Sequence, residues 1–124
     1  MVQTDLSQLA AECQEWRQIL RNYREEFQTC KKSLEEICRK TLSKGQLQEI
    51  EHFDNQFHIQ LINIHDLKHS IKHHERKIAT ESENDAGDEL YAHHETLLDQ
   101  FLTQENTLQE LRIEFQNFIS STNC

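Results

Sequence analysis

Residues 4–41 have the sequence TDLSQLAAECQEWRQILRNYREEFQTCKKSLEEICRKT. Apolar, aromatic and small side chains recur in this stretch at alternating steps of three and four residues: Leu6, Leu9, Cys13, Trp16, Leu20, Tyr23, Phe27, Cys30, Leu34, Ile37 and Thr41. A period of about 3.5 residues aligns side chains along one side of an α-helix, whereas a β-strand aligns every second residue. The stretch therefore predicts one long amphipathic helix over about residues 4–43.

The rest of the chain repeats this heptad pattern in two further segments. The second segment, about residues 46–81, has large apolar residues at heptad positions: Leu47, Ile50, Phe53, Phe57, Leu61, Ile64, Leu67, Ile71 and Ile78. The third segment, about residues 86–121, has two mostly apolar columns: His94, Phe101, Leu108 and Phe115 in one, and Leu90, Leu97, Gln104, Leu111 and Phe118 in the other. Gly45 and Gly87 interrupt the pattern, so we expect the connectors there.

Three helices of similar length joined by short connectors must run up, down and up, because a short connector makes neighbouring helices antiparallel. A 3.5-residue period favours left-handed coiled-coil packing at a shallow crossing angle. We therefore predict an all-α fold in which residues 1–124 form a single domain, an antiparallel three-helix bundle. This arrangement, with Trp16 on the seam of the first helix, resembles the spectrin-type repeat in architecture; the resemblance implies a fold and no particular function.

The composition excludes several other classes of protein. Of the 124 residues 35% are hydrophobic, and two Gly with no Pro are too few for the tight turns of a β-sandwich or barrel. Apolar runs are shorter than a transmembrane helix needs, and residues 1–5 lack the features of a secretory signal. Cys13, Cys30 and Cys38 would lie about 12 Å or more apart on one helix, so we expect reduced thiols in a cytoplasmic protein.

The net charge of −9 is concentrated in the last third of the chain, where residues 81–124 contain one basic and ten acidic residues. An acidic surface repels phosphates, so neither nucleic acid nor an anionic membrane is an expected partner. Arg17, Arg24 and Lys31 form a basic stripe beside the first seam. We expect these side chains to pair with acidic residues of the third helix.

Folding the chain back at residues near 44 and 84 places Cys13, His74 and His94 at one level of the bundle. A thiolate and two imidazoles are suitable ligands for tetrahedral zinc, and Glu75 or Glu95 is a candidate fourth ligand. The alternative is a polar layer in the core, in which neutral histidines bond to each other and Cys13 fills space. The sequence leaves both interpretations open.

A second group of histidines lies on the second segment and comprises His58, His65, His69 and His73. His65 with His69, and His69 with His73, are four residues apart, a spacing at which two imidazoles of a helix can chelate Ni²⁺, Cu²⁺ or Zn²⁺. This stripe lies away from the seam. It predicts either adventitious metal affinity or an ordinary solvated polar face.

Four large aliphatic residues fall outside the seams at the middle of the predicted rod: Ile59, Ile62, Leu102 and Ile113. Single exposed aliphatics are common, but four at one level could form a patch that a homodimer or a partner helix covers. No catalytic motif accompanies them, so we do not expect an enzyme. The leading hypothesis is a non-catalytic cytoplasmic bundle that acts through protein–protein contact or homo-oligomerisation; the alternative is a metal-binding or metal-sensing protein.

Overall fold

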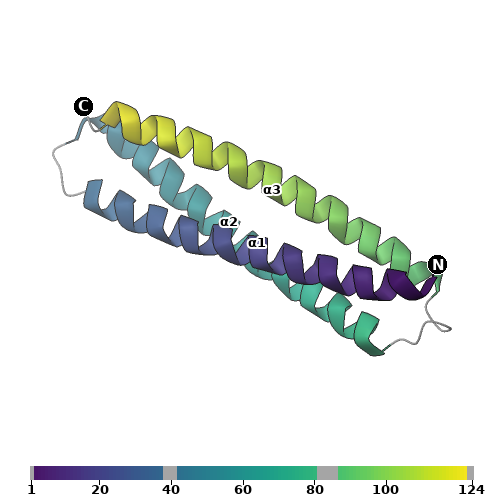
Figure 1. Cartoon of the computed structure of the whole chain (residues 1–124). Helices are drawn as coiled ribbons and strands as arrows, with labels where there is room; N and C mark the ends of the chain where they lie inside the picture. Colours follow the sequence, from purple (N-terminus) through teal and green to yellow (C-terminus); the bar gives the residue numbers. More distant parts are fainter. Residues whose placement is uncertain (1, 38–41, 81–86, 123–124) are drawn as a thin grey trace.

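The computed structural model describes residues 2–37, 42–80 and 87–122 and consists of three long helices (Figure 1). These are α1 (Val2–Ile37), α2 (Lys44–Thr80) and α3 (Asp88–Thr122). Each helix runs antiparallel to the one before it, and the described residues contain no strand. The predicted all-α three-helix bundle is confirmed. None of these three helices is apolar enough over a sufficient length to cross a bilayer.

The core follows the heptad positions of all three helices. Leu20 of α1, Phe57 and Ile64 of α2, and Leu108 of α3 have no exposed surface. The contacts between the helices are made through these seams, and burial of one such side chain contributes roughly 1.5–3 kcal/mol. The hydrophobic seams therefore hold the three helices together, as the period of the sequence predicts.

Phenylalanine rings fill the half of the core near the start of α2. Phe57 lies at the centre of this group, with ring centroids 5.2 Å from Phe27 of α1 and 4.9 Å from Phe115 of α3. Phe53 packs against Phe115 at 5.4 Å and Phe118 at 5.2 Å. These rings connect all three helices.

The helix ends differ from the predicted ones. Leu42 and Ser43 are not helical, so the first helix does not reach residue 43; residues 38–41 lie outside the described part of the chain. Ser43 instead caps α2, because its Oγ accepts from the Gln46 backbone N at 3.1 Å while Gln46 Oε1 accepts from the Ser43 N at 2.9 Å. Gly45 consequently lies inside the first turn of α2 and does not interrupt it.

Two core positions of α2 also differ from the prediction. Leu47 is 45% exposed and Leu61 only half-buried, whereas Gln60 is buried. The amide of Gln104, a predicted seam residue of α3, donates to Gln60 Oε1 at 2.8 Å. A hydrogen-bonded amide pair therefore replaces an apolar contact in the middle of the α2–α3 seam.

The basic stripe of α1 pairs with α2 and not with α3, which corrects the sequence-based expectation. Arg17 donates to both carboxylate oxygens of Glu75 at 2.8 and 3.1 Å, and Lys31 Nζ lies 3.8 Å from Asp54. Arg24 makes no ion pair with a described residue. The basic stripe therefore faces the groove between α1 and α2.

Candidate metal centre

A polar layer separate from the Gln60–Gln104 pair interrupts the apolar core, and each helix supplies one residue to it. Cys13 of α1 and His74 of α2 have no exposed surface, and His94 of α3 is 5% exposed. Their sulfur and ring-nitrogen atoms all lie within 4.8 Å of one another. The structure thus brings together the three residues that the sequence places at one level.

The distances within this layer are close to those around a zinc ion. Bonds of about 2.0–2.3 Å in a tetrahedral site hold neighbouring nitrogen and sulfur ligands about 3.3–3.6 Å apart. Here His74 Nε2 lies 3.1 Å from His94 Nδ1, and Cys13 Sγ lies 4.0 Å from the same Nδ1 atom. The two nitrogens lie slightly closer together, and the sulfur and Nδ1 slightly farther apart, than they would around an ion.

Glu12 orients His94 in this site, a role that the sequence pattern does not indicate. Its Oε1 atom lies 2.7 Å from His94 Nε2, on the opposite side of the ring from Cys13 and His74. The hydrogen bond to His94 lowers the pKa of Glu12 although burial opposes the shift, so Glu12 is a carboxylate that accepts the Nε2 proton. This contact leaves the lone pair of His94 Nδ1 directed at the cluster, as in the carboxylate–histidine pairs of zinc sites.

Neither carboxylate that the sequence suggests as a fourth ligand joins the cluster. Both oxygens of Glu75 accept hydrogen bonds from Arg17, and Glu95 is exposed. The candidate ligand set among the described residues is therefore one thiolate and two imidazoles. An ion held by three such ligands retains a coordination position for water or another small ligand.

Aromatic rings cover the cluster. The Trp16 ring centroid lies 4.7 Å from that of His94, and the His93 ring packs edge-on against His74 at 4.8 Å. Burial, followed by the nearby His93 and His94, lowers the pKa of His74 from 6.5 to about 4. Burial also raises the pKa of the Cys13 thiol to about 12, with Glu75 and Glu12 adding to the shift. Without metal, this layer contains a neutral His74 ring and a protonated thiol.

A metal-free hydrogen-bond network fits the same atoms. With neutral rings, His94 donates from Nε2 to Glu12, and its Nδ1 accepts from His74 Nε2. His74 Nδ1 is then a buried acceptor, and no described residue bonds to it. The polar-layer interpretation therefore satisfies most of the buried polar atoms but not all of them.

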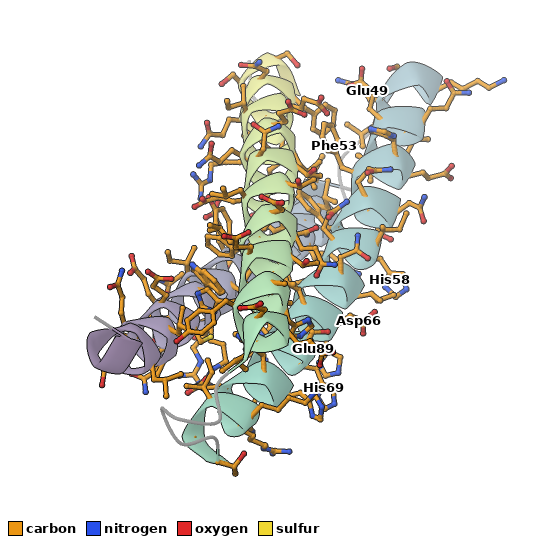
Figure 2. The ribbon with its side chains drawn as sticks, turned by 90° about the vertical axis from the view of Figure 1, so that its right-hand side faces the viewer. Glu49, Phe53, His58, Asp66, His69 and Glu89 are labelled. Carbon is orange, nitrogen blue, oxygen red and sulfur yellow. The ribbon has the colours of Figure 1, made fainter. Side chains whose placement is uncertain are left out.

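The second histidine group is separate from this centre. His65, His69 and His73 are exposed, and the rings of His65 and His69 stack with centroids 6.4 Å apart. Figure 2 shows His58 and His69 directed away from α1 and α3. Among the described residues, Cys13, His74 and His94 form the one group of three or more His, Cys, Asp or Glu residues suited to a metal ion. The stripe on α2 offers only pairs of ligands.

The four aliphatic residues that the sequence assigns to a partner surface are all exposed, by 38–56%: Ile59, Ile62, Leu102 and Ile113. Gln104 faces α2, because its amide donates to Gln60. A helix turns about 100° per residue, so Leu102 and Ile113 lie about 160–180° from Gln104, on the side of α3 away from α2. The four residues therefore do not form one patch: Ile59 and Ile62 lie one turn apart on α2, whereas Leu102 and Ile113 lie about 16 Å apart along α3.

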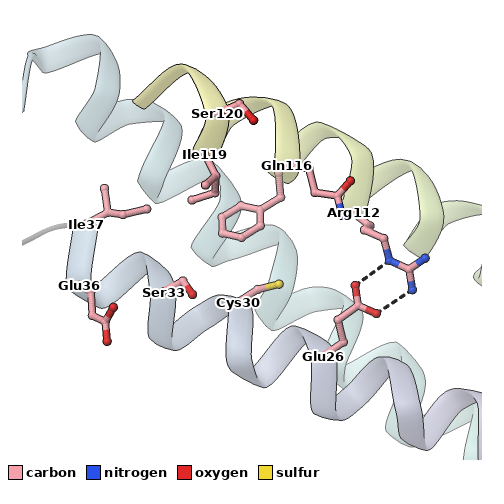
Figure 3. Close-up of a pocket in the computed structure, with 10 residues that line it drawn as sticks. Glu26, Cys30, Ser33, Glu36, Ile37, Arg112, Gln116, Ile119 and Ser120 are labelled. Carbon is pink, nitrogen blue, oxygen red and sulfur yellow. Dashed lines mark hydrogen bonds and ion pairs between the residues drawn. The ribbon is translucent and has the colours of Figure 1, made fainter. Parts of the chain in front are cut away.

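A groove of about 730 Å³ lies between α1 and α3 at the other end of the bundle (Figure 3). Cys30, Ile37 and Ile119 contribute to its lining. Arg112 donates to the two oxygens of Glu26 at 2.6 and 2.7 Å at the edge of this groove. Since Glu26 neutralises the arginine, the groove offers mainly apolar and uncharged contacts, and we assign it no ligand.

Comparisons of the chain with models of protein families, with curated proteins and with solved structures find no match.

Proposed function

We propose that this chain is a non-catalytic helical bundle that binds one transition-metal ion, zinc first among them, through Cys13, His74 and His94. The observation that supports this proposal most is the position of Glu12. The carboxylate fixes the His94 ring so that its free nitrogen faces the other two ligands, 3.1 Å from His74 and 4.0 Å from Cys13. The metal-free network uses the same orientation of His94, because there its Nδ1 accepts from His74 Nε2.

The charges of the layer suit a divalent ion. Binding displaces the thiol proton, so Zn²⁺, the Cys13 thiolate and the Glu12 carboxylate sum to zero inside a buried site. This neutralisation reduces the free-energy cost of burying the ion, because an uncompensated charge in the core is strongly destabilising. Because the thiol pKa is raised, binding becomes tighter as the pH increases.

The experiment that tests this proposal is elemental analysis of the untagged protein purified without added metal. We expect about one equivalent of zinc per chain, and a lower melting temperature after removal of the ion by EDTA, because a ligand that binds only the folded state stabilises it. The Cys13→Ser and His94→Gln variants should lose the metal, while the surface variant His58→Gln should retain it. Substoichiometric metal together with melting that EDTA leaves unchanged would exclude the proposal.

A second candidate function is protein–protein contact, including homodimer formation, in a reducing compartment such as the cytoplasm. The exposure of Ile62 at 48% and of Ile113 at 56% supports it, as does the placement of Ile59 one turn from Ile62. Aliphatic pairs on a helix surface are suited to packing against an apolar stripe of another helix. Cys13 and Cys30 are free thiols, which such a compartment would preserve.

Light scattering of the wild type and of the Ile62→Lys variant tests this second candidate. We expect a wild-type dimer and a monomeric variant, because a lysine charge cannot be buried unpaired at an apolar interface. Asn117→Lys adds the same charge at an exposed polar position of α3 and should leave the dimer intact. A wild-type protein that is monomeric at all concentrations would refute the homodimer.

A further inference from the structure

Four basic side chains lie close together at the groove between α1 and α2, where the three arginines of α1 repel Lys68 of α2. Arg17, Arg21 and Arg24 follow one another at steps of four and three residues, which places them along one side of α1. Lys68 reaches the same groove from α2: the groove has a volume of about 320 Å³, and its lining includes Arg17, Arg21 and Lys68. The amide side chains of Gln14 and Gln18 complete this lining. It lies on the opposite side of α1 from the contact between Glu12 and α3.

Most of this positive charge has no partner within the protein. The carboxylate of Glu75 neutralises Arg17 by accepting two hydrogen bonds from it. In residues 2–37, 42–80 and 87–122, no carboxylate forms an ion pair with Arg21, Arg24 or Lys68. Arg21 and Lys68 in the lining, and Arg24 beside Lys68, are therefore three cations without a matching set of acids.

Arg24, next to the groove, also lacks a hydrogen-bond acceptor for one of its nitrogens. The Nε atom of Arg24 is buried, and no described residue bonds to it. Burial lowers the pKa of Lys68, and repulsion from Arg24, Arg21 and Arg17 lowers it further, while Glu25 opposes the shift. Like charges held close together cost free energy that a bound anion would recover.

We propose that the groove lined by Arg17, Arg21 and Lys68, together with the adjacent Arg24, binds a small ligand with two linked phosphoryl groups, as in pyrophosphate. Two linked phosphoryl groups carry a charge of roughly −3, which matches the three unpaired cations. Guanidinium groups donate in a planar fork that fits phosphoryl oxygens, and a lysine adds a mobile point charge. Gln14 and Gln18 provide further donors at the rim.

The charge distribution of the whole chain favours a small ligand over an extended polyanion. The net charge is −9, and residues 81–124 contain ten acidic residues and one basic residue. A nucleic acid or an anionic bilayer extends beyond the groove and interacts with the net negative charge of the whole chain. A small anion interacts only with charges within about one Debye length, roughly 8 Å at physiological ionic strength. The local positive charge of the groove therefore dominates its binding.

Isothermal titration with inorganic pyrophosphate tests this proposal on the protein as purified. We expect one binding site, and we expect Arg21→Ala and Lys68→Ala each to weaken binding about tenfold, since each removes a charge-assisted contact. Lys44→Ala is the matched control: it removes an exposed unit charge about 36 Å away along α2 and should change Kd less than about twofold. Circular dichroism melts of the same variants establish that they are folded.

Three results would overturn this proposal. The first is the absence of binding heat for pyrophosphate with the wild type. The second is an equal loss of affinity in Lys44→Ala, which would indicate non-specific attraction. The third is that the protein sediments with vesicles containing a bisphosphorylated inositol lipid but does not bind free pyrophosphate. The Cys13→Ala variant should bind pyrophosphate as the wild type does, which separates this site from the metal centre.

Discussion

Replacing Phe57 by alanine is expected to lower the free energy of unfolding by about 3–5 kcal/mol. Phe57 has no exposed surface, and its ring contacts those of Phe27 on α1 and Phe115 on α3 at 5.2 and 4.9 Å. Deleting the ring opens a cavity where all three helices meet, and the long helices cannot collapse into it without breaking the other seam contacts. Chemical denaturation followed by circular dichroism measures the loss.

The neighbouring residue Ile59 provides the control for this prediction. It lies two residues from Phe57 on the same helix, but its side chain is 38% exposed. Ile59→Ala should change the free energy of unfolding by less than about 1 kcal/mol. Equal losses for the two variants would show that the core does not lie where the structure places it.

Acidification of the metal-free protein is expected to remove up to about 3 kcal/mol of stability through His74 alone. Its folded pKa is lowered from 6.5 to about 4, so the unfolded chain binds a proton at pH values where the folded chain does not. This contribution is fully present above pH 6.5 and is lost as the pH falls from 6.5 to about 4. Chemical denaturation at a series of pH values measures it.

The groups that face His74 come from all three helices. His93 and His94 of α3 and Lys77 of α2 add to the effect of burial on its pKa, and Cys13 of α1 is a neutral thiol in the same layer. The pKa of Glu12 is lowered from its ordinary value of 4.5. Glu12 therefore also contributes to the loss of stability in acid, but only below about pH 4.5.

Two variants isolate the contribution of His74 to the pH dependence. His74→Leu should flatten the dependence between pH 6.5 and 4.5, and the exposed-histidine variant His58→Gln should keep the wild-type slope. An unchanged slope in His74→Leu would show that burial of His74 is not the cause.

The fold was predictable because strict periodicity fixes which side of a helix is buried. The same rule explains the errors in α2. Steps of three and four from Ile50 lead through Phe53 and Phe57 to Gln60 and, further on, to His74; both polar residues are buried. Leu47 was predicted in the seam for its hydrophobicity, yet it is 45% exposed. In this bundle the heptad position of a residue determines whether its side chain is buried. Most of these buried positions, but not all, are occupied by hydrophobic residues.

The candidate metal centre was only partly predictable, because the sequence sets the height of a residue along the bundle but not which helix lies on which side of α1. A fixed rise of 1.5 Å per residue places Cys13, His74 and His94 at one height once the connectors are located. Which helix lies on which flank of α1 depends on the handedness of the bundle, which a heptad pattern does not encode. For that reason the contact of Glu12 with α3, and the pairing of Arg17 with α2, became evident only in the structure.

Titration with Co²⁺ tests the central proposal most directly, because this ion replaces zinc and reports its ligands by absorption. The proposed site predicts saturation at one equivalent, a thiolate-to-cobalt band in the near ultraviolet and visible bands of a low-coordinate ion. The Cys13→Ser variant should lose the thiolate band, and Cys30→Ser, which removes the other described free thiol, should keep it. A thiolate band that survives in Cys13→Ser, or a spectrum that remains that of aqueous Co²⁺, would contradict the assignment of Cys13, His74 and His94 as a metal centre.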